Sequence, residues 1–419
     1  MNREKHAKNP LLLIFITVFI DFMGLGVALP VLAPLFVGAG STLFSSSTTL
    51  DERTAMYGYI LGIFSIAQFL GAPLLGAYSD RLGRRKVLTF ASLVNSIGFL
   101  LFAAGIYFKN VQLLFFSRIL SGFLGSSLPV VQSALADVST QENKVRNFSL
   151  VGIGFGSGFL VGAIISGILS NPEIVPWFNF TTPFLFVAIM NIVNFCFIYF
   201  KLPETLKEFN PHNIQFLSGF QNIQKAYTHK NLRLLFLMIF IMTVGFSFFL
   251  QFMQVHLITK FSYTEFQLGM FVAYFAVCVA LSQAIVLRKV SLYIEPDKVL
   301  LFSIPLFALS YCLMIAPSNH IWLYVFIPIM TTFQGLTYPN SLAILSNSSS
   351  DNVQGEVIGI NQSVQSLAMA IPPLAGGYLM SKSINAPMLL GAACAFLGWI
   401  TYLFYYSRKN QVVAVSEKS

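Results

Sequence analysis

Long apolar segments alternate with short polar links along the whole chain. Twelve segments are long enough to cross about 30 Å of hydrocarbon as helices, because a helix rises about 1.5 Å per residue. They span residues 11–36, 57–78, 87–108, 111–136, 149–169, 183–201, 231–256, 265–287, 299–316, 320–345, 356–380 and 386–407. The pattern therefore predicts an all-α membrane protein with 12 transmembrane helices.

The polar link at residues 202–230 is the longest and divides these segments into two sets of six. Two equal sets are typical of an internal parallel repeat. We therefore expect two pseudo-symmetric six-helix bundles, an N-terminal one over residues 1–201 and a C-terminal one over residues 231–419. The residues between them, 202–230, form the predicted central linker.

Composition places most of the protein surface in lipid. Hydrophobic residues make up 56% of the 419, and charged residues make up only 10%. A soluble protein of this length could not bury so much apolar surface. The four cysteines all lie in apolar segments, without the spacing of a metal site or a disulfide framework. We therefore expect no metal and no cofactor.

The basic residues gather in alternate links. A net charge of +9 would suggest a nucleic-acid partner in a soluble domain. Here the remaining links hold only Arg53, Lys109, Lys260 and Lys382, and Arg118 falls within a segment. Because Lys and Arg favour the cytoplasmic side of a membrane, we expect both termini in the cytoplasm and residues 41–55 outside. The charge thus indicates a multi-pass protein of an inner or plasma membrane, and no nucleic-acid partner.

Two ionisable side chains fall well inside the predicted helices. Asp21 lies ten residues into the first segment, near the middle of the bilayer. A charge at that depth costs about 2.5–3.5 kcal/mol on insertion scales, and burial favours the neutral carboxyl. Asp21 can therefore exchange a proton, contact a substrate, or act as a structural acid paired with a neighbouring helix. Arg118, in the fourth segment, does not titrate, but its approach stabilises a nearby carboxylate in the charged form.

A charged link of unusual composition separates the second and third segments. An acid comes first, a glycine allows a sharp turn, and a basic cluster follows. Its marked residues are Gly76, Asp80, Arg81, Gly83, Arg84 and Arg85. Membrane orientation alone explains the basic residues. The complete pattern G-x-x-x-G-x-x-x-D-R-x-G-R-R resembles the loop between helices 2 and 3 of the major facilitator superfamily.

This resemblance implies a gating loop in a transporter that works by alternating access. Arg84 would then meet Asp137, at the end of the fourth helix. Asp80 would lie against the N-terminus of the eleventh helix, near Gly355, where the helix dipole favours an anion. Such contacts would hold one conformation and break in the other.

Residues 11–205 are most similar to the tetracycline and multidrug proton antiporters of the superfamily. Asp21 opens the stretch D-x-x-G-x-G-x-x-x-P, in which the tetracycline exporters carry a functionally important acid. Arg118 opens the stretch R-x-x-S-G, which in this family is held to take part in proton transfer. The resemblance therefore assigns proton coupling to Asp21 and Arg118.

The fifth segment carries glycines that resemble the antiporter motif G-x-x-x-G-P-x-x-G-G. The matching residues are Gly158, Gly162 and Gly167. Ala163 stands where the family has proline, and Ser166 where it has glycine, which weakens the case for export specifically. Close helix packing alone would also explain these glycines.

Polar side chains at helical spacing mark the seventh and eleventh segments. They are Gln251, Gln254, Asn361, Gln362 and Gln365. Such residues line a substrate cavity or form hydrogen bonds between helices, and the spacing does not separate the two interpretations. A cavity of this kind, apolar with a few amides, suits a neutral or zwitterionic solute.

Together these features predict a secondary active transporter that exports a small amphipathic compound, of the tetracycline or multidrug type, in exchange for protons. Proton-linked uptake or efflux of a metabolite, such as an amino acid, nucleoside or siderophore, is the alternative on the same fold. No cluster of nucleophile, base or metal ligands lies in the segments, so we expect no enzyme activity. The expected partners are the small-molecule substrate, protons and membrane lipid, and we expect a monomer.

Overall fold

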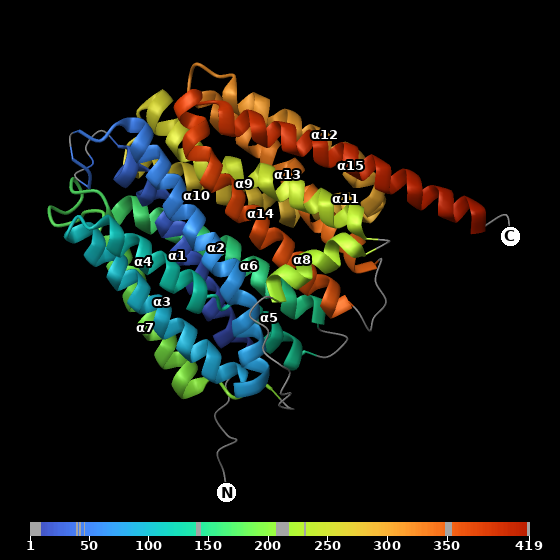
Figure 1. The fold of residues 1–419 in the computed structure, drawn as a ribbon, viewed down its shortest axis with the longest axis horizontal. Helices are drawn as coiled ribbons and strands as arrows, with labels where there is room; N and C mark the ends of the chain where they lie inside the picture. The colour runs from blue at the N-terminus through green and yellow to red at the C-terminus, as the bar shows by residue number, and fades with distance from the viewer. Residues whose placement is uncertain are drawn as a thin grey trace, which may run out of the picture. The chain divides into compact units, whose positions relative to one another are not determined.

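The computed structural model describes residues 10–38, 41, 43–45, 47–139, 144–206, 218–229, 232–347 and 354–416. Within this described part all regular structure is helical, which confirms the predicted all-α class (Figure 1). The helices form two compact units. Unit 1 falls within residues 1–218 and 262–276, and unit 2 within residues 219–261 and 277–419. The bundle boundaries expected from the sequence stay a prediction.

In unit 1 the first helix of the chain packs along the helix that carries the motif glycines Gly158, Gly162 and Gly167. The unit comprises α1 (Pro10–Val37), α2 (Leu50–Leu82), α3 (Arg84–Tyr107), α4 (Val111–Leu124), α5 (Leu128–Asp137), α6 (Lys144–Leu169), α7 (Thr182–Lys201) and the first part of α10 (Glu265–Leu281). The most extensive contacts join α1 to α6, α3 to α7 and α2 to α4.

Unit 2 is organised around α9, which packs against both α14 and α15. It comprises α8 (Ser218–Thr228), α9 (Arg233–Phe261), the end of α10, the π-helical η2 (Ser282–Leu287), α11 (Arg288–Tyr293), α12 (Pro296–Ile315), α13 (Ile321–Asn347), α14 (Gln354–Lys382) and α15 (Ala386–Ser416). A second extensive contact joins α12 to α13.

Eleven stretches of the described residues are long and apolar enough to cross a membrane. Each corresponds to one of the twelve predicted segments. The remaining segment, 356–380, corresponds to α14, a 29-residue helix that is not among these eleven stretches and that carries several Gln, Asn and Ser residues. The protein is therefore an integral multi-pass membrane protein.

Several helices extend beyond their predicted segments, among them α2, α9 and α15, and the fourth and eighth segments also differ in continuity. The fourth is two helices, α4 and α5, separated by Gly125–Ser127. A hydropathy pattern does not detect this break, because the run from Val111 to Asp137 remains apolar on average despite a glycine and two serines. The eighth continues through η2 and α11 to Tyr293, beyond its expected end at 287. Arg288 and Lys289, expected in a link, are therefore helical; their long aliphatic stems allow basic side chains to extend a helix toward the membrane surface.

The ends of α2 show why the chain turns where it does. At its start Thr49 and Glu52 form a capping box, in which each side chain accepts the other residue's backbone N–H. At its end Gly83 has a φ of 100°, which glycine adopts without a steric penalty. Helix α3 begins at the next residue, so α2 and α3 form a tight hairpin.

Candidate functional site

Asp21 lies on α1 beside the break between α4 and α5. The Ser127 hydroxyl donates a hydrogen bond to Asp21 Oδ2. The Asn95 side-chain amide, on α3, lies 3.5 Å from Asp21 Oδ1 and donates at 2.9 Å to the Gly125 carbonyl. Both donors are neutral, and Asp21 forms no ion pair with any described residue. The carboxyl group is thus held by groups that do not force it to stay charged.

Arg118 is buried elsewhere in unit 1, with 8% of its surface exposed. Its guanidinium carbon lies 4.3 Å from the centre of the Phe102 ring and 5.8 Å from that of Phe64, the geometry of cation–π contacts. Its Nε and Nη2 atoms donate no hydrogen bond to the described residues. In this conformation Asp21 and Arg118 do not pair, and their expected cooperation in proton coupling stays a prediction.

Glycines on α1 and α6 bring the two backbones together on both sides of Asp21. A Cβ on Gly158 would overlap the Phe19 carbonyl, and one on Gly162 would overlap the Met23 carbonyl. Gly167 lies farther along α6, where a Cβ would meet the backbone of Phe266 and Gly269 on α10 at 3.5 Å. Two of the motif glycines therefore fix the position of the helix segment that carries Asp21.

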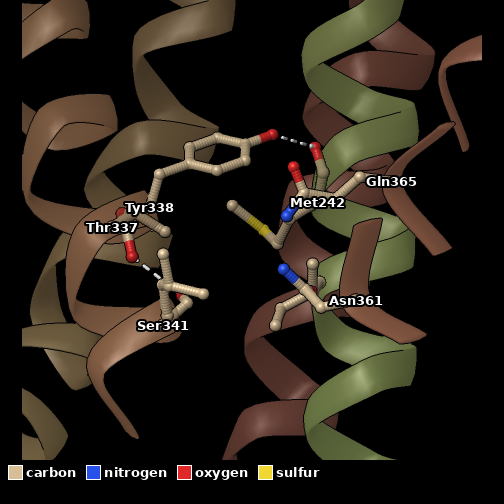
Figure 2. Close-up of a pocket in the computed structure, with 8 residues that line it drawn as sticks. Met242, Thr337, Tyr338, Ser341, Asn361 and Gln365 are labelled. Carbon is tan, nitrogen blue, oxygen red and sulfur yellow. Dashed lines mark hydrogen bonds between the residues drawn. The ribbon is translucent and has the colours of Figure 1, made fainter. Parts of the chain in front are cut away.

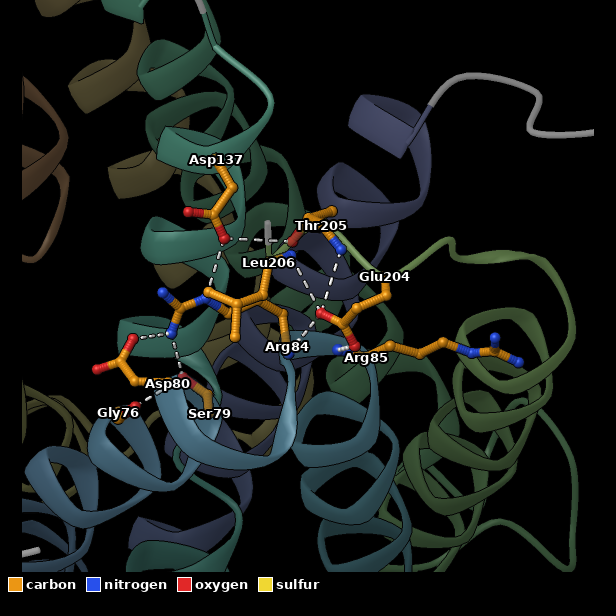
Figure 3. A network of polar contacts seen from close by, with 9 residues as sticks. All are labelled: Gly76, Ser79, Asp80, Arg84, Arg85, Asp137, Glu204, Thr205 and Leu206. Atoms are coloured by element: carbon orange, nitrogen blue, oxygen red, sulfur yellow. Dashed lines mark hydrogen bonds and ion pairs between the residues drawn. The ribbon is translucent and has the colours of Figure 1, made fainter. Parts of the chain in front are cut away.

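Arg84, which is itself buried, is the centre of a polar network at the hairpin between α2 and α3 (Figure 3). Its Nη1 lies 2.6 Å from Asp80 Oδ1, and its Nε lies 3.0 Å from Asp137 Oδ2. Nη1 also donates to the Ser79 hydroxyl at 2.5 Å, and Ser79 donates to the Gly76 carbonyl at 2.7 Å. The contact between Arg84 and Asp137 expected from the resemblance is thus present, and its role in gating stays a prediction.

The other basic residues of the hairpin lie outside this centre. Arg81 is exposed, and the Arg85 side chain points away from Arg84, donates to the Tyr199 carbonyl and lies over the Tyr199 ring (Figure 3). The predicted approach of Asp80 to Gly355 joins unit 1 to unit 2, and it also stays a prediction.

Sequence reasoning missed Glu204, which completes the network. Its carboxylate accepts backbone N–H bonds at 2.8–3.3 Å from Arg84, Arg85, Thr205 and Leu206. The first two N–H groups belong to the exposed start of α3, whose N-cap residue, Gly83, has no side chain to accept them. The sequence shows that the N-cap position of this helix has no capping side chain, but it does not show which distant acid accepts the N–H groups instead. Below, the Arg84 network means Ser79, Asp80, Arg84, Asp137, Glu204 and Thr205.

A pocket in unit 2 lies among α9, α13 and α14. Its empty volume is about 280 Å³, part of it open to the surroundings. In Figure 2, Tyr338 from α13 faces Asn361 and Gln365 from α14 across the Met242 side chain from α9. The rest of its lining comprises Ile239, Thr337, Ser341 and Leu342. The pocket is apolar apart from hydroxyl and amide groups, and no charged residue lines it.

Two of the five predicted cavity residues line this pocket. Asn361 is 4% exposed, and its Oδ1 accepts no hydrogen bond from the described residues. Gln365 is its neighbour one turn along α14. Gln251 instead bonds to Ser247 and to the Met369 carbonyl, which joins α9 to α14. The sequence did not single out the hydroxyl groups of α13, because threonine, serine and tyrosine are common in membrane helices.

The two remaining predicted cavity residues lie away from the pocket lining. Gln254 is buried on α9, and Gln362 is half-buried on α14. The pocket thus brings together two of the five amides, and their role toward a substrate stays a prediction.

Comparison with known proteins agrees with this architecture. A sequence profile of the Major Facilitator Superfamily matches residues 11–294 and 235–418. The chain is 26% identical over 418 residues to the class H tetracycline resistance protein of Pasteurella multocida, covering 97% of this chain and 98% of that protein. It is 24% identical over 417 residues to multidrug resistance protein 2 of Bacillus subtilis (strain 168), covering 98% of each.

Solved structures share the fold. The human organic anion transporter MFSD10 (TETRAN) superposes with a TM-score of 0.72 at 19% identity, over 94% of this chain and 98% of that one. A D-xylose–proton symporter superposes with a TM-score of 0.74 at 13% identity, over 95% of this chain and 96% of that one.

Proposed function

Because the chain belongs to the Major Facilitator Superfamily, a family of membrane transporters rather than enzymes, we propose that it exports a small amphipathic compound in exchange for protons. The relatives named for tetracycline and multidrug resistance support this direction and substrate class. We further propose that the chain acts as a monomer in a bacterial inner membrane, with both termini in the cytoplasm.

The observation that carries the proposal is the surroundings of Asp21. A carboxyl group with a cation beside it would stay charged through the cycle. Asp21 has only the neutral donors Ser127 and Asn95, so both its charged and its protonated forms can be accommodated. An antiporter needs such a group, because proton and substrate must bind in different states of the same protein.

The pocket of unit 2 supports a neutral or zwitterionic substrate. A charged group would find no counter-ion among the residues that line it. The side-chain amides of Asn361 and Gln365 line the pocket and offer hydrogen bonds to polar groups of the substrate, and Asn361 Oδ1 has no partner among the described residues. The apolar side chains of Met242 and Leu342 would cover the rest of the molecule.

One departure favours the alternative, a proton-linked transporter of a metabolite. Ala163 is fully buried on α6 at the position of the motif's proline, and Ser166 donates a hydrogen bond at 3.0 Å to the Val27 carbonyl. The motif therefore differs from that of the exporters at the point where α6 contacts α1. The fold is shared with a sugar symporter, so fold alone does not decide between the two substrates.

The test has two steps. Untargeted comparison of solutes in cells with and without the protein identifies the compound that is depleted when the protein is present. Purified protein in proteoliposomes should then accumulate that compound on the side from which protons leave, as the protons flow down an imposed gradient. Accumulation in the same direction as the protons would instead establish symport, and a metabolite as the compound moved, in either direction, would establish the alternative.

The proposed topology is tested with single cysteines at Ser46 and Lys207, both outside the described residues. An impermeant thiol reagent added to intact cells should label the first and not the second. The reverse pattern would overturn the assignment of the termini to the cytoplasm.

A further inference from the structure

One short helix, α5, connects Asp21 to the Arg84 network. The residue before it, Ser127, bonds to Asp21, and its last residue, Asp137, bonds to Arg84. We propose that Ser127 and Asn95 are positioning residues through which the charge on Asp21 holds α5, and that α5 carries the protonation state of Asp21 to the Arg84 network. This inference rests on the proposed function, in which Asp21 carries the coupling proton.

At the first end, Asp21 is attached to both sides of the break. Ser127 is the N-cap of α5, but its hydroxyl makes no capping bond to the helix and donates to Asp21 instead. On the other side, the Asn95 amide joins Asp21 to the carbonyl of Gly125, which follows the last residue of α4. A Cβ on Gly125 would overlap the Asn95 side chain, so this approach requires glycine there.

Protonation changes what these groups can do. A charged carboxylate accepts from both Ser127 and Asn95, and hydrogen bonds to a charged acceptor are about twice as strong as neutral ones. A protonated carboxyl must itself donate, so one of its oxygens no longer accepts as before. Asp21 therefore holds the start of α5 more strongly when it is charged.

Helix α5 is suited to transmit this change. It has ten residues, so it is about 15 Å long. Val130, Val131, Ala134 and Leu135 are fully buried against the surrounding helices, which makes it a rigid element that moves as a whole. A displacement at Ser127 is therefore also a displacement at Asp137.

At the second end, Asp137 is shared by two elements of the Arg84 network. Arg84 Nε lies 3.0 Å from its Oδ2, and Thr205 Oγ1 lies 3.4 Å from the same atom. Arg84 has only 7% of its side chain exposed, so loss of Asp137 would leave a buried cation with the half-exposed Asp80 as its remaining acid partner. Movement of α5 therefore weakens the contacts of Asp137 with Arg84 and Thr205, which belong to the proposed gating network.

Few other charges act on Asp21. The charged residues of the helices around it lie near helix ends: Asp51, Glu52, Arg53, Asp80 and Arg81 on α2, Arg84, Arg85 and Lys86 on α3, Asp137 on α5, Lys144 and Arg146 on α6, and Lys201 on α7. Arg118 on α4 contacts aromatic rings rather than an acid. No ionisable group of the described residues other than Asp21 bonds to Ser127, Asn95 or Gly125.

The test is a thiol reporter at residue 205. Thr205 is 7% exposed, so a cysteine there reacts with an alkylating reagent only when the Arg84 network opens. The four native cysteines are first replaced: Cys196, Cys278, Cys312 and Cys394. The rate of alkylation in detergent is then measured at each pH and divided by the alkylation rate of the unfolded chain at the same pH. This ratio removes the effect of ionisation of the thiol itself. We expect the normalised rate to rise about 10-fold as the pH falls through the titration of Asp21, and to be independent of pH in Asp21→Asn.

Three variants separate positioning from general packing. Ser127→Ala and Asn95→Ala should each flatten the pH profile, and Ser127→Thr, which retains the hydroxyl, should restore it. Ser96→Ala is the matched control, because this buried serine donates to the Ala188 carbonyl rather than to an acid. The control should keep the profile of the parent protein.

The outcomes distinguish this inference from the proposed function on which it rests. A flat profile in Asp21→Asn, with normal profiles in Ser127→Ala and Asn95→Ala, overturns this inference and leaves the proposed function standing. A normal profile in Asp21→Asn also overturns this inference, because the carboxylates of the Arg84 network then account for the pH dependence, and the proposed function is tested separately by uphill transport in Asp21→Asn. If Ser127→Ala does not fold, Asn95→Ala and Ser127→Thr decide the question.

Discussion

The two units differ in the polar groups that they bury. Unit 1 buries the charged side chains Arg84 and Arg118 and holds Asp21 in its interior. In the described part of unit 2, no Asp, Glu, Lys or Arg is buried, and the buried polar residues are amides, hydroxyls and His256. This contrast suggests a division of work, in which unit 1 binds the proton and unit 2 contacts the neutral substrate.

The units also differ at corresponding helix starts. In unit 1 the carboxylate of Glu204, which follows α7, accepts a hydrogen bond from the backbone N–H of Arg84 at the start of α3. In unit 2 the acid, Asp297, belongs to the first turn of α12 itself and pairs with Lys409 of α15 at 2.8 Å. Both arrangements place an anion at a helix N-terminus, where the dipole favours it. Of these two arrangements, only the one in unit 1 also joins a buried arginine, Arg84.

The largest expected effect concerns the tight packing around Asp21. Gly158→Ala would force α6 away from the Phe19 carbonyl and should lower the free energy of unfolding by about 3 kcal/mol. Gly156→Ala is the matched control on the same helix, because a Cβ there meets nothing within 4 Å, and it should be neutral or stabilising by up to about 1 kcal/mol. In unit 2, Gly398→Ala meets the flexible Met242 side chain and should cost about 1 kcal/mol. Unfolding of the detergent-solubilised variants measures all three, and equal effects would contradict the close approach of the α1 and α6 backbones beside Asp21.

An effect of similar size is expected for the ion pairs of the two units. Arg84→Ala leaves Asp137 without its buried partner and should destabilise unit 1 by about 3 kcal/mol. Lys409→Ala removes a pair in which the lysine is 42% exposed, and it should cost less than about 1 kcal/mol. Chemical unfolding followed by tryptophan fluorescence compares the two variants. A loss for Lys409→Ala as large as that for Arg84→Ala would contradict the view that only unit 1 depends on buried charge.

The smallest effect tests the substrate side. Asn361→Leu removes the amide and keeps the branched shape of the side chain, so the half-saturating substrate concentration should rise about 10-fold while proton coupling is retained. Gln362→Leu is the control, because Gln362 belongs to the same helix but does not line the pocket. Transport assays over a range of substrate concentrations distinguish the two variants. Equal affinity in both would remove the pocket of unit 2 from the substrate path.

The sequence predicts the helices well, because each needs a long apolar run and the polar links are short. It does not predict the break at Gly125–Ser127, since three small residues lower the mean hydropathy of so long an apolar run only slightly and the break is stabilised by Asn95 from another helix. The acid Asp21 and the hairpin residue Arg84 were recognisable, because charge inside or beside an apolar run is rare.

Their partners were recognisable only in part. The resemblance pointed to the contact of Arg84 with Asp137, whereas Glu204, which lies 120 residues from Arg84, has no local signal. The donors to Asp21 are likewise ordinary serine and asparagine residues, whose importance comes from tertiary packing alone. The pocket shows the same limit, because helical spacing marks polar residues without saying which of them share a face toward a cavity.

The central claim is that Asp21 carries the coupling proton. Its most direct test is substrate-induced proton release and gradient-driven transport in proteoliposomes, measured for the parent protein, Asp21→Asn and Asp21→Glu. The account predicts that Asp21→Asn binds and passively exchanges substrate, releases no proton and accumulates nothing on a pH gradient, whereas Asp21→Glu keeps some uphill transport with a shifted pH optimum. An Asp21→Asn variant that still pumps its substrate uphill on a pH gradient would contradict the account.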